Sequence, residues 1–266
     1  MSKEFKKEIE KGISAICNEI GFKKKQYYFI KPIDKNITAT LSFGMALHQQ
    51  KGHIFVNVGV GVSHKDIEQL YTELTGIDKS IFKHTINEQI GNLMPNKIFK
   101  EWDFVENADN TCLFEDLLKS IQTYGFPYQE KMSHFDNLFV DTLNKKHHAN
   151  IYKLLSILYY LKGEKTEGWK IVEDALGKEK ERTKEYEFPT QPFNPMNNVS
   201  FGKEITEKEK QIIEQKYMKL FTPEIMKQAN QSKKEYINAN FIDSQYGRVS
   251  KEFLTFIERY EALPCN

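Results

Sequence analysis

The sequence predicts an α+β protein, in which a mostly antiparallel sheet with flanking helices is followed by a helical C-terminal region. Three observations support this fold class. Alternating valines mark a strand in the first hundred residues, helical spacing of apolar residues dominates from Cys112 onward, and a charged, proline-bearing segment interrupts the second half. These patterns divide the chain into an α+β sheet domain (1–110), a helical region packed with it (111–176), a linker (177–200) and C-terminal helices (201–266).

An amphipathic helix is expected at the N-terminus, followed by two strands. From Phe5 to Ile20, apolar residues recur at steps of three and four, which is typical of a helix with one buried face. Gly21 is expected to end this helix in the left-handed conformation. Strands are predicted at 25–32 and 36–47, joined by a turn that contains proline and aspartate.

The third strand contains the most regular pattern of the chain. The stretch GHIFVNVGVGVSHKD, which begins at Gly52, resembles a phosphate-binding loop. A dinucleotide fingerprint needs a third glycine where His64 stands, and the Gly-Lys-Ser/Thr ending of a P-loop is missing. Alternation places the valines on one face and Gly59 and Gly61 on the other. We therefore interpret the stretch as a core strand whose flat glycine face allows close packing.

The next segment is expected to contain a helix and two short strands. Ser63 and Asp66 have the spacing of a capping box for a helix over 64–75. Short strands are predicted at 83–92 and 97–105, with a Pro-Asn turn between them.

The second half is expected to be helical. A helix over 112–125 should end at Gly125, because Pro127 opposes its continuation. Ser133 is the expected N-cap of the next helix. A helical hairpin follows over 147–177, with a glycine at the end of each half. Residues 177–187 are almost purely charged, which indicates either a solvated helix extension or part of the linker. Three more helices are expected after the linker.

Several ordered landmarks resemble a known family. GFKKK follows the first helix, a β-meander ends in VNVGV, and QIGNLMP, Trp102 and YGFPY come after it. This order is similar to the bacterial family catalogued as domain of unknown function 4304, over about residues 5–145. The resemblance supports the predicted order of elements and implies no activity, because the family has none assigned.

The chain departs from the family pattern at three positions. Gln89 stands where the pattern has arginine, Phe99 where it has aspartate, and Glu101 where it has the first of two tryptophans. If that arginine and aspartate form a buried pair or a site in relatives, this chain lacks it.

Composition and charge exclude several classes of protein. The formal net charge is +1, which removes a global electrostatic argument for binding nucleic acid or membranes. The three cysteines lie far apart and form no Cys-x-x-Cys pair, so neither a zinc knuckle nor a disulfide framework is expected. No apolar segment of signal-peptide type follows the charged N-terminus, and we predict a cytoplasmic protein.

Candidate catalytic and metal-binding residues are weakly supported. His134, Asp136, Asp141, His147 and His148 crowd a short interval, but their spacing does not direct them to one ion. We therefore predict no metal site, no cofactor and no catalytic residue.

Cysteine and serine chemistry has equally little support. Cys112 begins a helix, where a thiol can become reactive, but the sequence gives it no local histidine partner. Cys17 fits the apolar side of the first helix, which predicts a buried, inert thiol. A serine nucleophile elbow is absent from the sequence.

A binding role remains, and another protein is the expected partner. Tyr27, Tyr28 and Trp102 are the candidate binding residues, because exposed aromatics contribute strongly to protein interfaces. The alternative for all three is burial in the core. A bacterial immunity-like protein, or a subunit of a defence or regulatory complex, is one setting for such a module.

Two other functions stay open. The first is an enzyme whose site is assembled from distant residues. The second is a nucleic-acid-binding protein that uses the stretch Lys23–Phe29, where lysines adjoin aromatics that can stack on bases.

Overall fold

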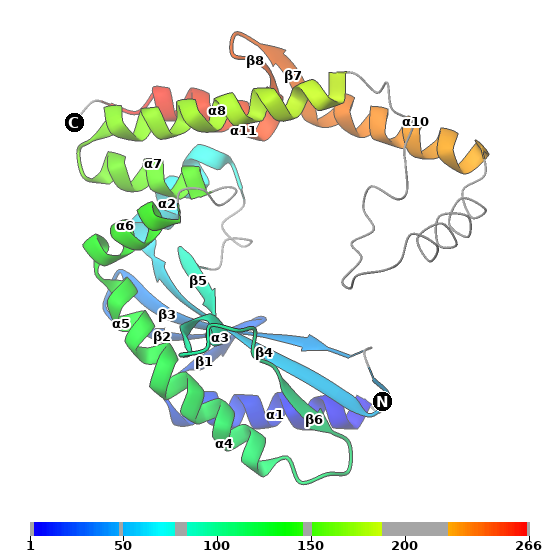
Figure 1. The fold of residues 1–266 in the computed structure, drawn as a ribbon. Helices are drawn as coiled ribbons and strands as arrows, with labels where there is room; N and C mark the ends of the chain where they lie inside the picture. Colours follow the sequence, from blue (N-terminus) through cyan, green and yellow to red (C-terminus); the bar gives the residue numbers. More distant parts are fainter. Residues whose placement is uncertain (1–2, 48–49, 78–83, 146–150, 188–222, 265–266) are drawn as a thin grey trace. The chain divides into compact units, whose positions relative to one another are not determined.

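The computed structural model describes residues 3–47, 50–77, 84–145, 151–187 and 223–264. The chain divides into two compact units, residues 1–168 with the last two residues of the chain, and residues 169–264. The first unit contains an antiparallel sheet and helices, and the second contains helices and one hairpin (Figure 1). The predicted α+β class is therefore confirmed.

The first unit follows the predicted order of elements with local differences. Its helices and strands, in chain order, are α1 (Lys3–Glu19), β1 (Lys23–Lys25), β2 (Tyr28–Pro32), β3 (Ile37–Ala46), β4 (His53–His64), α2 (Lys65–Thr75), β5 (Ile86–Gln89), α3 (Ile90–Leu93), β6 (Trp102–Val105), α4 (Thr111–Ser120), the π-helical turn η1 (Ile121–Gly125), α5 (Phe126–Ser133), α6 (Phe135–Asn144) and α7 (Ile151–Leu161).

Strand β4 organises the sheet. On one side it pairs with β3 over ten residue pairs, from Ala46↔Phe55 to Ile37↔His64. On the other side its second half pairs with β5 and its first half with β6, all antiparallel. The two predicted strands after α2 therefore both exist, but they pair with β4 rather than with each other. Between them lie the short helix α3 and then the predicted Pro-Asn turn, which is closed by a hydrogen bond from Lys97 N–H to the Met94 carbonyl at 3.0 Å.

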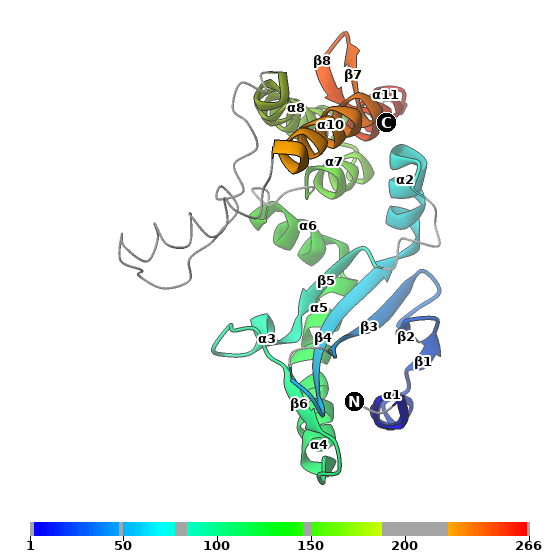
Figure 2. The same cartoon turned by 90° about the vertical axis from the view of Figure 1, so that its right-hand side faces the viewer.

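One face of the sheet forms the core of this unit. The alternating side chains of β4 from Ile54 to Val62 are all 0% exposed, as the valine pattern predicts. Helices α1, α4 and α5 lie against this face (Figures 1 and 2), and Phe104 of β6 contacts Phe114 of α4 at 4.8 Å between ring centroids. Cys17 of α1 is fully buried, which confirms the predicted burial, and burial raises the pKa of its thiol to about 12.

The opposite face is flat and polar. Register places Tyr28, Ser42 and Gly59 side by side on it, and Asn87 of β5 borders them. A Cβ atom added at Gly59 would lie 2.4 Å from the Ser42 hydroxyl and 2.9 Å from the Asn87 amide nitrogen. The glycines are therefore needed, but polar side chains of neighbouring strands occupy the space that they leave.

The predicted helix stop at Gly125 is wrong. The chain passes from α4 through η1 into α5 without leaving helical geometry, and Gly125 has φ −72° and ψ −49°. Phe126 N–H donates to the Ile121 carbonyl, five residues back, and Pro127 follows in the first turn of α5. Pro127 closely follows the wider π turn, and its fixed φ suits the helical geometry there.

Two predicted N-caps are also wrong. His64, rather than Ser63, precedes α2 and makes no capping bond with its side chain, while the Ser63 hydroxyl donates to the Glu68 carboxylate. Similarly, His134 precedes α6, while the Ser133 hydroxyl donates to the Glu130 carbonyl. In both cases the serine hydroxyl donates to a nearby oxygen, whereas an N-cap serine would accept from a backbone N–H of the helix.

The second unit is less regular than the sequence predicted. Its elements are α8 (Lys165–Glu187), which begins in the first unit, α10 (Pro223–Asn240), β7 (Phe241–Ser244), β8 (Gly247–Ser250) and α11 (Lys251–Glu261). The β7–β8 hairpin lies mainly between the second and third expected helices, where the sequence predicted no strand. Trp169 of α8 stacks on Tyr260 of α11 with ring centroids 6.3 Å apart, which ties these helices together.

The expected linker begins as helix. Helix α8 continues through Gly177, so residues 177–187 are helical and the predicted end at that glycine is wrong. The rest of the expected linker and the first of the helices predicted after it lie outside the described residues.

Candidate functional site

The three predicted binding residues lie in different environments. Tyr27 is 82% exposed in the turn between β1 and β2. Tyr28 is partly exposed on the polar face of the sheet. Trp102 is 1% exposed on the core face, where its indole N–H donates to Asp116 Oδ2 at 2.8 Å. The fold does not bring the three together, and the burial of Trp102 leaves its ring no surface for a partner.

A braced apolar loop lies between α3 and β6. Ile98 and Phe99 are adjacent, and each is 62% exposed. The Gln89 side chain accepts from Gly91 N–H at 2.6 Å and donates to the Lys100 carbonyl at 2.9 Å, so it joins both ends of the loop. Two large apolar side chains are therefore held outward on a fixed backbone.

Close packing against α3 fixes the same loop. A Cβ atom at Gly91 would lie 2.0 Å from the Ile98 carbonyl oxygen and 2.7 Å from Lys100 N. Both of these atoms belong to the backbone, so a larger residue would force the loop away from α3. Gln89, Phe99 and Glu101 lie together here, because Gln89 braces the loop, Phe99 is exposed in it and Glu101 precedes β6.

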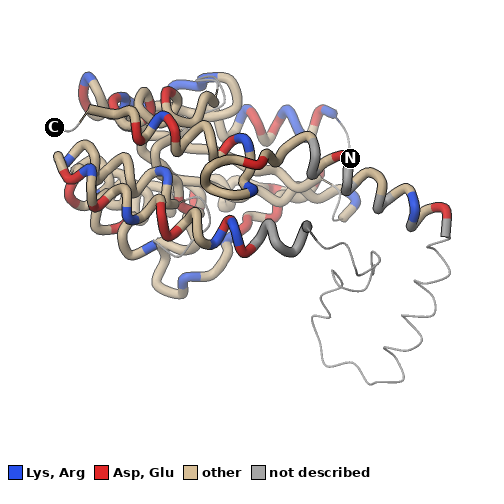
Figure 3. Tube along the Cα trace, turned by 90° about the horizontal axis from the view of Figure 1, so that it is seen from above, with Lys and Arg blue, Asp and Glu red and all other residues tan. Residues whose placement is uncertain are grey.

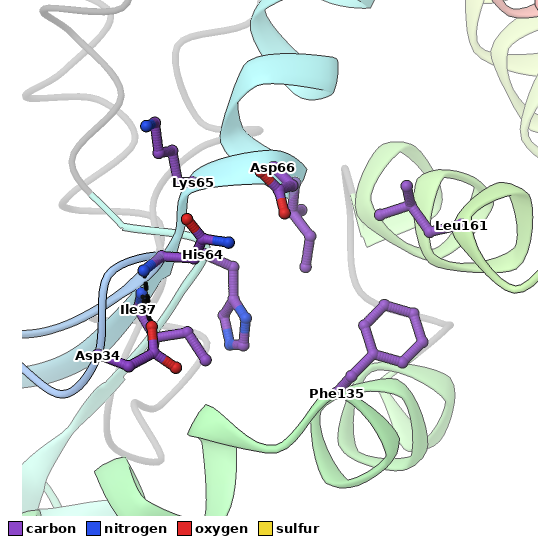
Figure 4. A pocket seen from close by; sticks show the side chains of 9 residues that line it. Asp34, Ile37, His64, Lys65, Asp66, Phe135 and Leu161 are labelled. Carbon is purple, nitrogen blue, oxygen red and sulfur yellow. Dashed lines mark hydrogen bonds between the residues drawn. The ribbon is translucent and has the colours of Figure 1, made fainter.

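A second candidate is a pocket of about 380 Å³ within the first unit. Its walls come from the β2–β3 turn, the junction of β4 and α2, α6 and α7. Figure 4 shows the His64 ring and the Phe135 ring on opposite sides of this space, with Leu161 beside Phe135. The Lys65 side chain extends away from them. The lining residues come from positions 34 to 161, so no local sequence motif predicts the pocket.

His64 is the buried polar residue of the pocket. His64 is 7% exposed, and its Nε2 atom lies 2.9 Å from the Met132 carbonyl oxygen. Burial lowers the pKa of His64, against smaller raising effects from the Met132 carbonyl and from the charges of Asp34 and Asp66. The ring is therefore held in its neutral form more firmly than an exposed histidine.

A third cluster joins β5 to α6. Lys145 Nζ lies 3.0 Å from Glu88 Oε2 and forms an ion pair with Asp141 Oδ2 at 3.0 Å. Burial opposes the charge of Lys145, but the two carboxylates outweigh it and raise its pKa. Tyr128 is buried beside them, and its pKa is raised by burial and by both acidic charges. The cluster links β5 to α6 through two carboxylates and one lysine, which is the arrangement of a structural tie.

The remaining candidate residues do not assemble into a site. His134 lies 3.7 Å from the Glu130 carboxylate, while Asp141 is committed to Lys145. His147 and His148 lie outside the described residues. Among the residues that the structure covers, no group of three His, Cys, Asp or Glu side chains could hold a metal ion. Cys112 is exposed near the start of α4.

Comparison with known proteins finds no relative. No protein-family model, no curated protein and no solved structure matches the chain. The resemblance to the family of unknown function stays a prediction. Within the described ranges, no helix is long and apolar enough to cross a membrane. The site geometry alone must therefore carry a functional conclusion.

Proposed function

We propose that this protein acts by docking another protein through the loop that presents Ile98 and Phe99. The observation that carries the proposal is the exposure of these two adjacent apolar side chains, 62% each, on a braced backbone. Single exposed apolar residues are common on protein surfaces, but an adjacent pair held outward is typical of an anchor that fills a partner's pocket.

The bracing matters because it lowers the cost of binding. Ordering a flexible loop consumes part of the interaction energy, so a loop that is already fixed binds more tightly with the same contacts. Gln89 and the close approach at Gly91 supply that order here. The predicted partner surface is an apolar groove on a protein, and an immunity-like role or membership of a regulatory complex is compatible with it.

Affinity purification followed by mass spectrometry tests the proposal. Wild-type protein should recover a partner at stoichiometric yield. Phe99→Ala should weaken binding by about 2 kcal/mol, roughly thirtyfold in dissociation constant, if Phe99 is an anchor. Val140→Ala is the matched control, because Val140 is 55% exposed on α6, away from the loop. Equal partner recovery by the Phe99 and Val140 variants would overturn the proposal.

Gly91→Ala separates loop placement from side-chain identity. It keeps Ile98 and Phe99 but displaces their backbone, because the added methyl group overlaps the Ile98 carbonyl. Under the proposal it lowers partner affinity although no apolar side chain is removed. Unchanged thermal unfolding of Phe99→Ala and Val140→Ala would show that differences in recovery report on binding.

One observation supports nucleic acid as a second candidate partner. The register Lys23↔Ile30 and Lys25↔Tyr28 places two lysines on the same face of the sheet as Tyr28. Lysines can contact phosphates while an aromatic ring stacks on a base. Against it, Figure 3 shows Lys and Arg interspersed with Asp and Glu along the described trace.

Fluorescence anisotropy with a single-stranded oligonucleotide tests this candidate. Binding that weakens with added salt and is lost in a Lys23→Glu, Lys25→Glu double variant would favour nucleic acid over a protein partner. Absence of binding at low salt would remove this candidate.

A further inference from the structure

We propose that the pocket at the junction of β4 and α2 binds an organic cation, namely a primary ammonium group attached to an apolar group. This site is separate from the docking loop and does not depend on the function proposed above. Its polar lining contains one histidine and two aspartates, which can accept hydrogen bonds, together with Asn36 and Lys65, and its remaining walls are apolar.

The first acceptor is Nδ1 of His64. The Met132 carbonyl can only accept a hydrogen bond, so Nε2, 2.9 Å away, carries the ring proton. In the neutral ring Nδ1 then carries a lone pair and no proton. Nδ1 makes no hydrogen bond to any residue that the structure covers, although the residue is 93% buried, since its exposed fraction is 7%. This acceptor is available to a ligand N–H.

Two carboxylates supply the charge. Asp34 Oδ1 accepts from the N–H groups of Asn36 and Ile37, at 2.6 and 2.7 Å. Its second oxygen has no hydrogen-bond partner among the described residues. Asp66 follows Lys65 at the start of α2, and its charge, like that of Asp34, acts on the His64 ring. Two carboxylates and an unprotonated nitrogen match the three N–H donors of a primary ammonium group.

The protein's own nearby cation does not occupy this position. Lys65 lines the mouth of the pocket, but its side chain extends away from His64 and Asp66 (Figure 4). Lys65 therefore does not pair with the carboxylates of Asp34 and Asp66 inside the pocket. Replacing Lys65 by methionine removes a competing positive charge and should tighten the binding of a cation.

The apolar walls define the other half of the ligand. Ile67 is 2% exposed beneath the pocket, and Phe135 and Leu161 form the wall that faces His64. An aromatic ring also attracts a cation placed over its face. Pockets of roughly 300–1,000 Å³ with apolar walls and a few placed polar groups are typical sites for small ligands. Such a wall favours an aryl or alkyl amine over a bare ammonium ion.

Titration of ¹³C,¹⁵N-labelled full-length protein with 2-phenylethylamine tests the proposal by NMR. The amine should shift the imidazole signals of His64 and the ring signals of Phe135. The uncharged analogue 2-phenylethanol should bind at least about tenfold more weakly, because it lacks the ammonium group. This comparison uses wild-type protein and does not depend on the folding of any variant. Equal binding of the alcohol, or unmoved His64 signals, would overturn the proposal.

Charge variants locate the site. The Asp34→Asn, Asp66→Asn double variant keeps an oxygen acceptor at position 34 for the turn, and it should raise the dissociation constant of the amine at least about tenfold. Asp136→Asn is the matched control, since Asp136 lies in α6 next to Phe135 and does not line the pocket. Wild-type affinity in the folded double variant would contradict the assignment.

The same chemistry has two sources, which a second probe distinguishes. Nα-acetyl-lysine methylamide represents a lysine side chain of a protein partner, whereas 2-phenylethylamine represents a free metabolite. Both probes carry a primary ammonium group. Tighter binding of the lysine probe assigns the pocket to a protein side chain, and tighter binding of the aryl amine assigns it to a small molecule. Failure of both overturns the proposal, and leaves the docking loop unaffected.

Discussion

His64 combines burial with one fixed hydrogen bond, and this combination has a measurable consequence. Burial lowers its pKa from the ordinary value of 6.5. Between the lowered native value and 6.5 the unfolded chain binds more protons than the folded chain, so stability falls as pH is lowered below about 6.5. An NMR titration should give a midpoint below 6.5 for His64. The wild type should lose more stability than His64→Gln over this interval, and a midpoint at or above 6.5 would contradict the account.

Replacing Lys145 should lower the stability of the first unit, because Lys145 balances the charge of two carboxylates. Its side chain and those of Glu88 and Asp141 are only 28%, 22% and 21% exposed. Lys145→Met leaves two partly buried carboxylates without their cation, which should cost about 1–3 kcal/mol. Lys6→Met is the matched control, because the Lys6–Glu10 pair is about as far apart in sequence as Lys145–Asp141 but more exposed.

The comparison is made by chemical denaturation of both variants at neutral pH. The control should lose no more than about 0.5 kcal/mol, which is typical of an exposed pair on a helix. Similar losses for the two lysine variants would show that the cluster is not the structural tie described above.

At the scale of elements, the helical geometry at the π turn predicts that replacing Gly125 by alanine stabilises the protein. Gly125 has right-handed helical geometry, and an added Cβ would lie 3.5 Å from Val60, which is ordinary contact. Gly125→Ala should therefore stabilise the protein by about 0.5–1 kcal/mol, since alanine loses less backbone freedom on folding. Gly21→Ala should instead destabilise it by about 1–2 kcal/mol, because Gly21 has φ +85°.

Thermal unfolding of the two glycine variants separates these roles. A loss of stability in Gly125→Ala similar to that in Gly21→Ala would mean that Gly125 is a true helix end, as the sequence pattern had indicated.

Regular periodicity explains which elements could be predicted. The valines of β4 recur every second residue and must share a face, so the central strand and its buried side followed from the sequence. The predicted helix end at Gly125 is wrong because a wider π turn continues the helix up to Pro127. A single π turn leaves no periodic pattern in the sequence from which it could be predicted. The β7–β8 hairpin was missed because its four-residue strands are too short to show alternation.

The candidate sites were harder to predict for a different reason. Aromatic residue type alone indicates Tyr27 and Tyr28 as binding candidates, and both are at least partly exposed. The same criterion also indicates Trp102, which is buried. Asp34, His64 and Phe135 share a pocket only because the β2–β3 turn, β4 and α6 converge, which no local pattern encodes. The sequence marks Phe99 only as a difference from the pattern that the chain resembles, and it predicts no exposure or binding role for this residue.

At the scale of the whole molecule, the first unit should fold without the second. The core face of its sheet and the helices that cover it all lie before residue 168. A fragment of residues 1–168 should unfold cooperatively and retain the amide NMR signals of β4. A boundary at residue 176, as the sequence indicated, would cut α8 in the middle. A fragment 1–168 that lacks cooperative unfolding would show that the division into two units is wrong.

The docking loop is the central claim, and hydroxyl-radical footprinting of the purified complex tests it most directly. Phe99 is 62% exposed in the free protein and should be oxidised readily. In the complex its oxidation should fall several-fold, because an anchor residue is buried at the centre of an interface. Tyr236, also 62% exposed but on α10, is the internal reference and should be oxidised equally with and without partner. Equal oxidation of Phe99 in the free and bound protein would contradict the claim.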